Sequence, residues 1–341
     1  MTDAATVAAL HAHTLTLDTH IDIRWPDPPD PATETDRQVD FPKMARGGLR
    51  AAVFIAYTPQ ARRDPDGHAA AAERAEAMLR HIRARADGET RRFCTTAAEV
   101  EAAAAAGAQV VLSAVENGNA MGRDLSRLAL WRSLGAIYVT LTHDGHNDLA
   151  DSARPKTDLG DGPEEHGGLS RLGREAIAEM NRVGLLVDVS HASRATMLQA
   201  AALSRTPVVA THACCAALRP HPRNLDDEQL DTLREVGGLV QITAVPAFLR
   251  APGEDGKTAA SVADIVDHVD YAVRRIGIDH VGLSSDFDGG GGVAGWADAS
   301  ESANLTAELM RRGYGAREIA LLWSGNFLRL MRLAQRAAEG G

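Results

Sequence analysis

Short apolar segments rich in Val, Ile and Leu alternate along the chain with longer segments of helical period that are rich in Ala, Leu, Arg and Glu. Parallel strands have this nearly continuous apolar character because helices cover both faces of their sheet. The pattern therefore predicts eight strands, in the ranges 14–22, 49–57, 109–117, 136–144, 184–191, 207–213, 238–245 and 280–288.

Helices are predicted between these strands, in the ranges 68–86, 96–106, 170–184, 191–203 and 261–277. Eight strand–helix repeats favour an α/β fold of the (β/α)8 TIM-type barrel class, with long loops at its C-terminal face. A doubly wound open sheet is the alternative. It would normally carry a Gly-rich phosphate turn after the first strand, where this chain reads THIDIRWPDPPD. No Gly/Ser linker divides the sequence, so residues 1–341 are expected to form a single barrel domain.

Three connections are too long to be tight turns, and each of them follows a predicted strand. They cover residues 23–48, 144–168 and 288–301. In a barrel such loops lie at the C-terminal face, where they build the functional site.

The composition narrows the classes of partner and compartment. A formal net charge of -10 argues against sequence-independent binding to nucleic acid or to an anionic membrane, which needs a basic surface. The first twenty residues do not read as a signal peptide, and no apolar stretch approaches the ~18 residues of a membrane span. Three cysteines, Cys94, Cys214 and Cys215, give no disulfide framework, so a cytoplasmic location is expected.

Side chains that bind metals recur at the C-terminal ends of the predicted strands. In a parallel barrel all these ends face one mouth, so residues far apart in sequence converge there. The first, third, fourth, fifth, sixth and eighth strands end in such residues, which are His20, Asp22, Glu116, His143, His191, His212, Asp286 and Asp288.

A metal centre explains five of these residues together. His20 and Asp22 are two apart on a strand, so both side chains leave the same face and can bind one ion. His191 and His212 could hold a second ion, and Glu116 could bridge the two. Each residue alone could be a hydrogen-bonded structural group, but five such groups buried on one rim without a metal would cost several kcal/mol.

The remaining histidines lack convergent partners in the sequence. His11, His13, His68, His81, His268 and His280 fall in helical or pre-strand positions, where most are expected to be solvated. His146, His166 and His221 lie in the long loops or near the rim and stay undecided.

Six sequence blocks carry a family resemblance. LDTHID, SAVENG, YVTLTH, VDVSHAS, THACCAALRPHPRN and SSDFDGG occur in this order between residues 17 and 290. With them the chain resembles the renal (membrane) dipeptidase family, peptidase family M19, whose members are zinc peptidases among the amidohydrolase-type barrels. The DGHNDLADSA that follows TLTH resembles its bacterial branch.

The resemblance implies a binuclear zinc dipeptidase. Two zinc ions per chain would be bridged by Glu116 and a hydroxide, one ion held by His20 and Asp22 and the other by His191 and His212. The substrates would be small dipeptides, including L-Xaa-D-Xaa, and a homodimer is a further expectation from the family.

The resemblance also implies roles for residues that contact the substrate. His143 would orient the scissile carbonyl and stabilise its developing oxyanion, and Arg223, in HPRN, would bind the C-terminal carboxylate of the dipeptide. Asp286 would be the proton shuttle, with Asp288 sharing or assisting that role.

Three other functions compete with this one. Another amidohydrolase-type enzyme could act on N-acyl amino acids or a related amide. A barrel that binds a metal or ligand without catalysis would have lost a metal ligand or the proton shuttle, and all are present. A metal-free lyase would need a Schiff-base lysine, but Lys43, Lys156 and Lys257 do not lie at strand ends.

Overall fold

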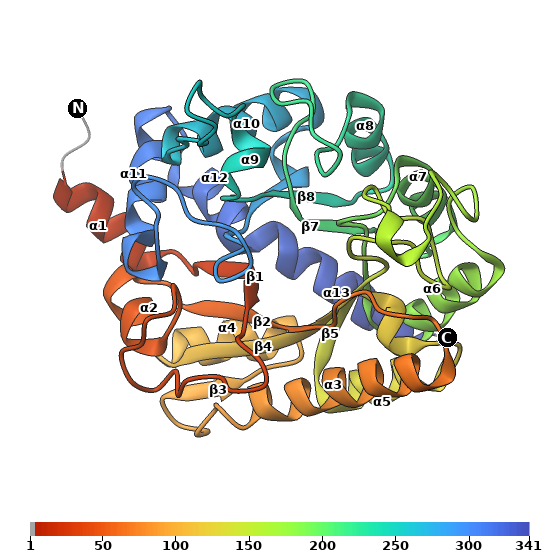
Figure 1. The fold of residues 1–341 in the computed structure, drawn as a ribbon. Helices are drawn as coiled ribbons and strands as arrows, with labels where there is room; N and C mark the ends of the chain where they lie inside the picture. Colours follow the sequence, from red (N-terminus) through yellow and green to blue (C-terminus); the bar gives the residue numbers. More distant parts are fainter. Residues whose placement is uncertain (1–3, 341) are drawn as a thin grey trace.

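A ring of parallel strands surrounded by helices forms the centre of the molecule in the computed structural model, which describes residues 4–340 (Figure 1). The strands are hydrogen-bonded in the order β1-β2-β4-β5-β6-β7-β8-β9, and every ladder is parallel. They are β1 (Leu17–Asp22), β2 (Ala51–Tyr57), β4 (Gln109–Glu116), β5 (Ala136–Thr140), β6 (Leu186–Asp188), β7 (Val209–Ala213), β8 (Leu239–Ile242) and β9 (Val281–Leu283). The predicted barrel class is confirmed.

The barrel closes between its first and last strands through the segment that follows β9. Ile21 forms a parallel bridge with Phe287, and the N–H of Asp22 donates to the carbonyl oxygen of Phe287 over 3.0 Å. The N–H of Asp286 donates in turn to the carbonyl oxygen of His20 over 3.1 Å. These bonds bring the end of the eighth predicted strand beside the end of the first.

One strand was not predicted. β3 (Arg91–Phe93) pairs with β4 outside the ring. The five predicted helices correspond to α3, α4, α6, α7 and α10, with ends shifted by one to three residues. The helices are α1 (Ala4–His13), α2 (Phe41–Gly47), α3 (Pro65–Arg83), α4 (Ala97–Ala105), α5 (Ser126–Leu134), α6 (Arg171–Val183), α7 (Arg194–Leu203), α8 (Asp227–Glu235), α9 (Pro246–Leu249), α10 (Val262–Ile276), α11 (Ser302–Arg311), α12 (Ala316–Ala320) and α13 (Asn326–Glu339).

The local signals that start and stop α6 act as expected. The side chain of Ser170 accepts a hydrogen bond from the N–H of Gly173. The helix ends at Gly184, whose φ of 79° places it in the left-handed region that glycine adopts without steric cost.

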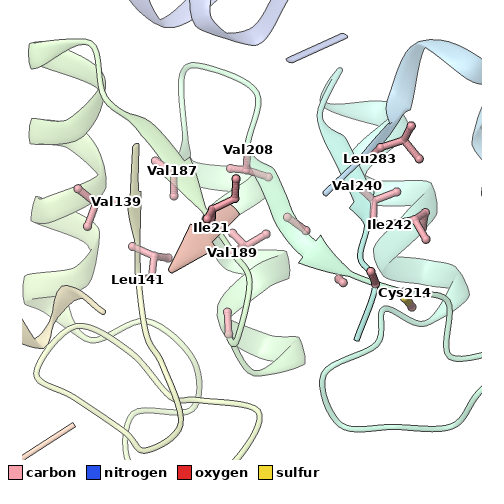
Figure 2. Close-up of a cluster of buried hydrophobic side chains, with 14 of the residues drawn as sticks. Ile21, Val139, Leu141, Val187, Val189, Val208, Cys214, Val240, Ile242 and Leu283 are labelled. Atoms are coloured by element: carbon pink, nitrogen blue, oxygen red, sulfur yellow. The ribbon is translucent and has the colours of Figure 1, made fainter. Parts of the chain in front are cut away.

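Side chains on each strand alternate between the surrounding helices and the barrel interior. On β6, Val187 joins the large hydrophobic cluster, and Val189, just beyond the strand, does so too (Figure 2). Asp188 between them lies inside, where its carboxylate accepts hydrogen bonds from the hydroxyls of Thr140 and Thr211 over 2.6 and 2.8 Å. The interior at this level is therefore polar.

Helix α13 closes the opposite end of the barrel. Its Phe327, Leu330 and Met331 belong to one hydrophobic cluster with residues at the starts of the strands, such as Leu17 and Leu239. Because that end is packed with apolar side chains, the polar C-terminal mouth is where a small ligand can enter.

Four predicted strands end at least three residues earlier than expected, and one of them is β8, which stops at Ile242. β5, β6 and β9 stop three residues before His143, His191 and Asp286, so these three side chains project from the loops just above the ring. The predicted helix 191–203 begins only at Arg194, capped by the side chain of Ser193. The long connection 23–48 contains α2, which the sequence analysis did not anticipate.

Candidate metal centre

Three histidines converge on one buried carboxylate at the mouth of the barrel. Glu116 is the last residue of β4, and its Oε1 lies 3.6 Å from Nε2 of His20, 3.2 Å from Nε2 of His191 and 3.5 Å from Nε2 of His212. His20 and His212 come from β1 and β7, on other sides of the ring. The barrel thus places side chains from four separate segments around one point.

Hydrogen bonds orient the three imidazole rings. The hydroxyl of Tyr138 donates to the carbonyl oxygen of Thr19, so its oxygen accepts from Nδ1 of His20 over 3.0 Å. Thr211 donates to Asp188, so its hydroxyl oxygen accepts from Nδ1 of His212 over 3.0 Å. The third pairing joins Nδ1 of His191 to Oδ1 of Asp144 over 3.2 Å. With each Nδ1 engaged in these hydrogen bonds, each Nε2 faces Glu116 and is the ring atom that can bind a metal ion.

The electrostatics of this cluster favours a bound cation. Burial lowers the pKa of His20, but the carboxylates of Glu116, Asp286 and Asp22 outweigh burial and raise this pKa to about 10. Burial and the charge of Glu116 raise the pKa of Asp22 well above its ordinary value. A divalent ion would supply the positive charge that these carboxylates otherwise draw onto His20 as a proton. Imidazole and carboxylate donors suit Zn²⁺ or another borderline divalent ion.

The donor atoms fall into three groups, each spanning less than 4.8 Å, and these groups overlap. One contains His20, Glu116 and His212, and a second contains Glu116, His143 and His191. The third contains His20, Asp22 and Asp286. Since Glu116 and His20 each belong to two groups, the three groups form one continuous cluster of possible metal ligands.

His143 lies at the edge of the centre rather than within the trio around Glu116. Its ring stacks on His191, with centroids 4.0 Å apart, and contacts Tyr57 at 4.7 Å. Burial, followed by the charge of His191, lowers the pKa of His143 to about 3. The ring is therefore neutral near pH 7 and can donate one N–H to an oxygen atom.

Unusual backbone conformations concentrate at this rim. Within residues 4–340, the non-glycine residues with positive φ are Asn117, His191, Asp286 and Asp288, at 81°, 63°, 58° and 64°. All four follow strand ends. Such conformations cost about 1–3 kcal/mol each and persist where the surrounding structure holds side chains in place for function.

Asp286 is buried beside the third group of donors. Burial first, and then the charge of Glu116, raise its pKa, while His20 and Arg223 oppose the rise, and the result is about 7. A carboxyl group that titrates near 7 can both take and give a proton at physiological pH. Gly289 lies against it: a Cβ atom there would approach Oδ1 of Asp286 and Oδ2 of Asp22 to well within 3.0 Å.

Asp288 is engaged in holding two loops together. Its Oδ1 accepts from the N–H of Gln38 over 2.9 Å and lies 3.3 Å from Nε of Arg37, while its own N–H donates to Oε1 of Gln38 over 2.6 Å. Gln38 also donates to the carbonyl oxygen of Gly291. Through these contacts, Asp288 links the segment after β9 to the segment after β1.

Arg223 lies on the loop after β7 and lines the cavity that opens above the candidate metal centre. Its side chain is buried, and among residues 4–340 its Nε and Nη1 have no hydrogen-bond partner. Its Cζ lies 5.2 Å above the ring of Phe248, and Nη2 donates to the carbonyl oxygen of His212 over 3.5 Å. A buried guanidinium with two nitrogen atoms free of hydrogen-bond partners is suited to bind an anion.

Several histidines outside the centre have structural roles, and the expectation that they are solvated is wrong for two of them. His11 is 4% exposed and bonds to Thr306 and Gly47, and His268 is 1% exposed and accepts from the N–H of Cys215. His268 lies on the buried face of the amphipathic helix α10, whereas His11 is the buried residue of α1; the sequence analysis resolved neither position.

The loop 144–168 uses the undecided histidines to fix its shape. The ring of His146 accepts from the N–H of Ser152 and bonds to the carbonyl oxygen of Gly162. His166 bonds to the carbonyl oxygen of Asn147. The third undecided residue, His221, lines the cavity beside Arg223.

The sequence analysis missed the groups that orient the histidines. Tyr138, Asp188 and Thr211 lie inside predicted strands, and Asp144 follows His143 directly. Polar residues within the apolar strands could have indicated these groups, because a buried polar side chain needs a hydrogen-bond partner. Their partners lie on other strands, which the sequence does not specify.

A cavity of about 780 Å³ opens above the centre. It is lined by Glu116, His143, His191, His212, Arg223 and Asp286, among others.

Residues 4–340 match the family model described as Membrane dipeptidase (Peptidase family M19). The chain belongs to this family.

Relatives in this family include solved structures and curated proteins. The probable dipeptidase PvdM from Pseudomonas aeruginosa is 30% identical with a TM-score of 0.91, the alignment covering 98% of each chain. A metallo peptidase from Rhodobacter sphaeroides, liganded with a phosphinate mimic of L-Ala-D-Ala, is 28% identical with a TM-score of 0.77, covering 94% of this chain and 99% of that one.

Among curated proteins, dipeptidase aclJ from Aspergillus oryzae is 38% identical over 229 residues, or 67% of this chain and 52% of the relative. The matched region thus spans about half the length of such curated relatives. Among the described residues, no helix is long and apolar enough to cross a membrane.

Proposed function

We propose that the chain is a two-metal dipeptidase that uses zinc to hydrolyse small dipeptides, including L-Xaa-D-Xaa. The observation that carries this proposal is the convergence of three oriented imidazoles on buried Glu116, in a cavity that also holds the unpartnered guanidinium of Arg223. Family membership and the relative that binds a phosphinate mimic of L-Ala-D-Ala support it.

In this proposal His20 and Asp22 would hold one zinc ion, His191 and His212 the other, and Glu116 would bridge them. Bound together, two such ions lower the pKa of a shared water and polarise the scissile carbonyl. The whole chain would act as one metal-hydrolase barrel. The cytoplasmic location and the homodimer stay predictions.

The protein side chains would then bind and orient the substrate. Arg223 would pair with the C-terminal carboxylate, since its free N–H groups form a fork that fits two oxygens. Neutral His143 would donate a hydrogen bond to the carbonyl oxygen as negative charge develops there.

Asp286 would move the proton. Its pKa of about 7 suits a group that removes a proton from the attacking water and then delivers it to the leaving amine. Asp288 would assist by fixing the loop that carries Asp286, because its carboxylate is already bonded to Gln38 and Arg37.

The carboxylates near the proposed metals favour dipeptides over N-acyl amino acids. A dipeptide carries a free ammonium group, which Asp286 and Asp288, the two cavity carboxylates after β9 that are not assigned to a metal, can attract. An N-acyl amino acid presents a neutral amide at the same place. N-acetyl-alanine should therefore be a poor substrate compared with Ala-Ala.

Steady-state hydrolysis of paired L-Ala-L-Xaa and L-Ala-D-Xaa dipeptides by the zinc-reconstituted protein tests the proposal, with N-acetyl-alanine alongside. Turnover of dipeptides that vanishes in His191→Ala is expected. A protein that binds two zinc ions but hydrolyses no dipeptide would overturn the dipeptidase assignment. Hydrolysis of N-acetyl-alanine above all dipeptides would favour an acylamino-acid hydrolase instead.

A further inference from the structure

One wall of the cavity is cationic. Arg223, His221 and Arg154 line it, and Phe248 packs between two of them. The ring of Phe248 lies 4.6 Å from that of His221 and 5.2 Å below Cζ of Arg223. The N–H of Arg223 donates to Nδ1 of His221 over 3.1 Å, which fixes the imidazole against this wall. These contacts hold Arg223, His221 and Phe248 against one another.

Arg154 adds a second guanidinium to this wall. Within residues 4–340, its ion pair joins Nη1 to Oδ2 of Asp144 over 3.1 Å. The other oxygen of Asp144 already bonds to His191. A guanidinium has five N–H donors, and the Arg154 side chain is 53% exposed, so most of its donors stay accessible at the cavity. Burial and then the charges of Arg223 and Arg154 lower the pKa of His221, which agrees with a positive field at this wall.

The part of the cavity lining that comes from the segments after β1 and β9 has a different balance of charges. Asp22, Asp286 and Asp288 lie there, and its Arg37 is paired with Asp288 at 3.3 Å. The other arginine there, Arg24, donates from Nε to a backbone carbonyl oxygen of its own loop. The amine end of a dipeptide thus fits this acidic part, and its C-terminal residue fits the cationic wall.

We propose that the enzyme prefers dipeptides whose C-terminal residue has an acidic side chain, Asp or Glu, because that side chain meets Arg154 while Arg223 binds the main-chain carboxylate. This inference rests on the proposed dipeptidase function. It concerns the side-chain carboxylate of the C-terminal residue, which the proposed hydrolysis itself does not need.

Matched substrates isolate this second carboxylate. Ala-Asp and Ala-Asn have nearly the same shape and differ in one charge, as do Ala-Glu and Ala-Gln. We expect kcat/KM to be about fivefold or more higher for the acidic member of each pair, as for a charge-assisted hydrogen bond at a half-exposed site. Measuring each pair with an L and with a D C-terminal residue covers both stereochemical classes.

Two variants locate the effect. In Arg154→Met the acidic-to-amide ratio of kcat/KM should fall to about one. Any indirect effect through Asp144 and His191 changes both members of a pair alike and cancels in the ratio. Arg24→Met is the matched control, because Arg24 lines the same cavity and is 49% exposed but comes from the segment after β1. Its ratio should equal that of the unmodified enzyme.

The outcomes separate this inference from the function on which it rests. Equal kcat/KM for acidic and amide dipeptides, or a preference that survives in Arg154→Met, would overturn the inference and leave the dipeptidase intact. Failure of the zinc-loaded enzyme to hydrolyse any of these dipeptides, and Ala-Ala as well, would overturn the proposed function itself.

Discussion

Replacing Gly289 with alanine would place a methyl group between two carboxylates of the candidate metal centre. The Cβ would lie well within 3.0 Å of Oδ2 of Asp22 and of Oδ1 of Asp286, whereas ordinary van der Waals contact begins at 3.4 Å. The φ of Gly289 is not in the left-handed region, so alanine adopts this backbone without strain. The effect of the substitution should therefore come from steric displacement of the two carboxylates.

The size of this displacement sets the expected loss. Each oxygen has to move by about 1 Å, and metal sites tolerate about 0.2 Å in ligand distance. We expect Gly289→Ala to lose the metal ion that His20 and Asp22 are proposed to hold and to lower kcat/KM by about 10²-fold or more. Overpacking should lower the free energy of unfolding by about 1–3 kcal/mol, which leaves the fold intact.

Metal content per chain after zinc reconstitution, dipeptide kinetics and thermal unfolding together test this reasoning. Gly290→Ala is the control on the same turn. Its φ of 149° makes alanine strained, but its Cβ would meet no atom within 4 Å, so stability should fall while metal content stays normal. Full metal content with near-normal kcat/KM in Gly289→Ala would refute the placement of Asp22 and Asp286 at the centre. Equal metal loss in both variants would refute the steric cause.

Three further changes test separate parts of the molecule. Asp286→Asn should leave zinc content near normal and lower kcat by about 10²–10⁴-fold, and unchanged turnover would exclude it as the proton shuttle. Asp144→Asn should weaken zinc affinity about 10–100-fold in competition with a chelator, because a neutral amide is a weaker acceptor for Nδ1–H of His191 than a carboxylate. Unaltered affinity would show that the charge of Asp144 does not support this ring. Burial lowers the pKa of His11 below its ordinary value of 6.5. Below pH 6.5, His11 is therefore protonated in the unfolded chain but stays neutral in the folded protein. The free energy of unfolding should thus fall as the pH drops from 7.5 to 5.5, and His11 should contribute up to about 1.4 kcal/mol per pH unit to this fall. The decline in Tm over this range should be shallower in His11→Gln than in the unmodified protein.

The barrel and the candidate donors could be read from the sequence because each depends on a local pattern. Strands buried on both faces leave apolar runs such as the one containing Val187, and helices leave a 3.6-residue period with caps such as Ser170. In a closed barrel of parallel strands, the C-terminal ends of all the strands also lie at the same end of the barrel. A polar residue that terminates an apolar run, such as Glu116, is therefore placed at the mouth before any contact is known.

Only the tertiary structure decided how these donors are arranged and held. The bonds from Tyr138 to His20 and from Asp144 to His191 join segments 118 and 47 residues apart, and no local pattern encodes them. The close approach of Gly289 to Asp22 depends on barrel closure, which brings the segment after β9 against β1. The sequence by itself therefore determined which chemical groups reach the mouth, because strand periodicity fixes where each chain segment ends. Their tautomers, charges and neighbours followed from packing between distant segments, which determines burial and hydrogen-bond partners.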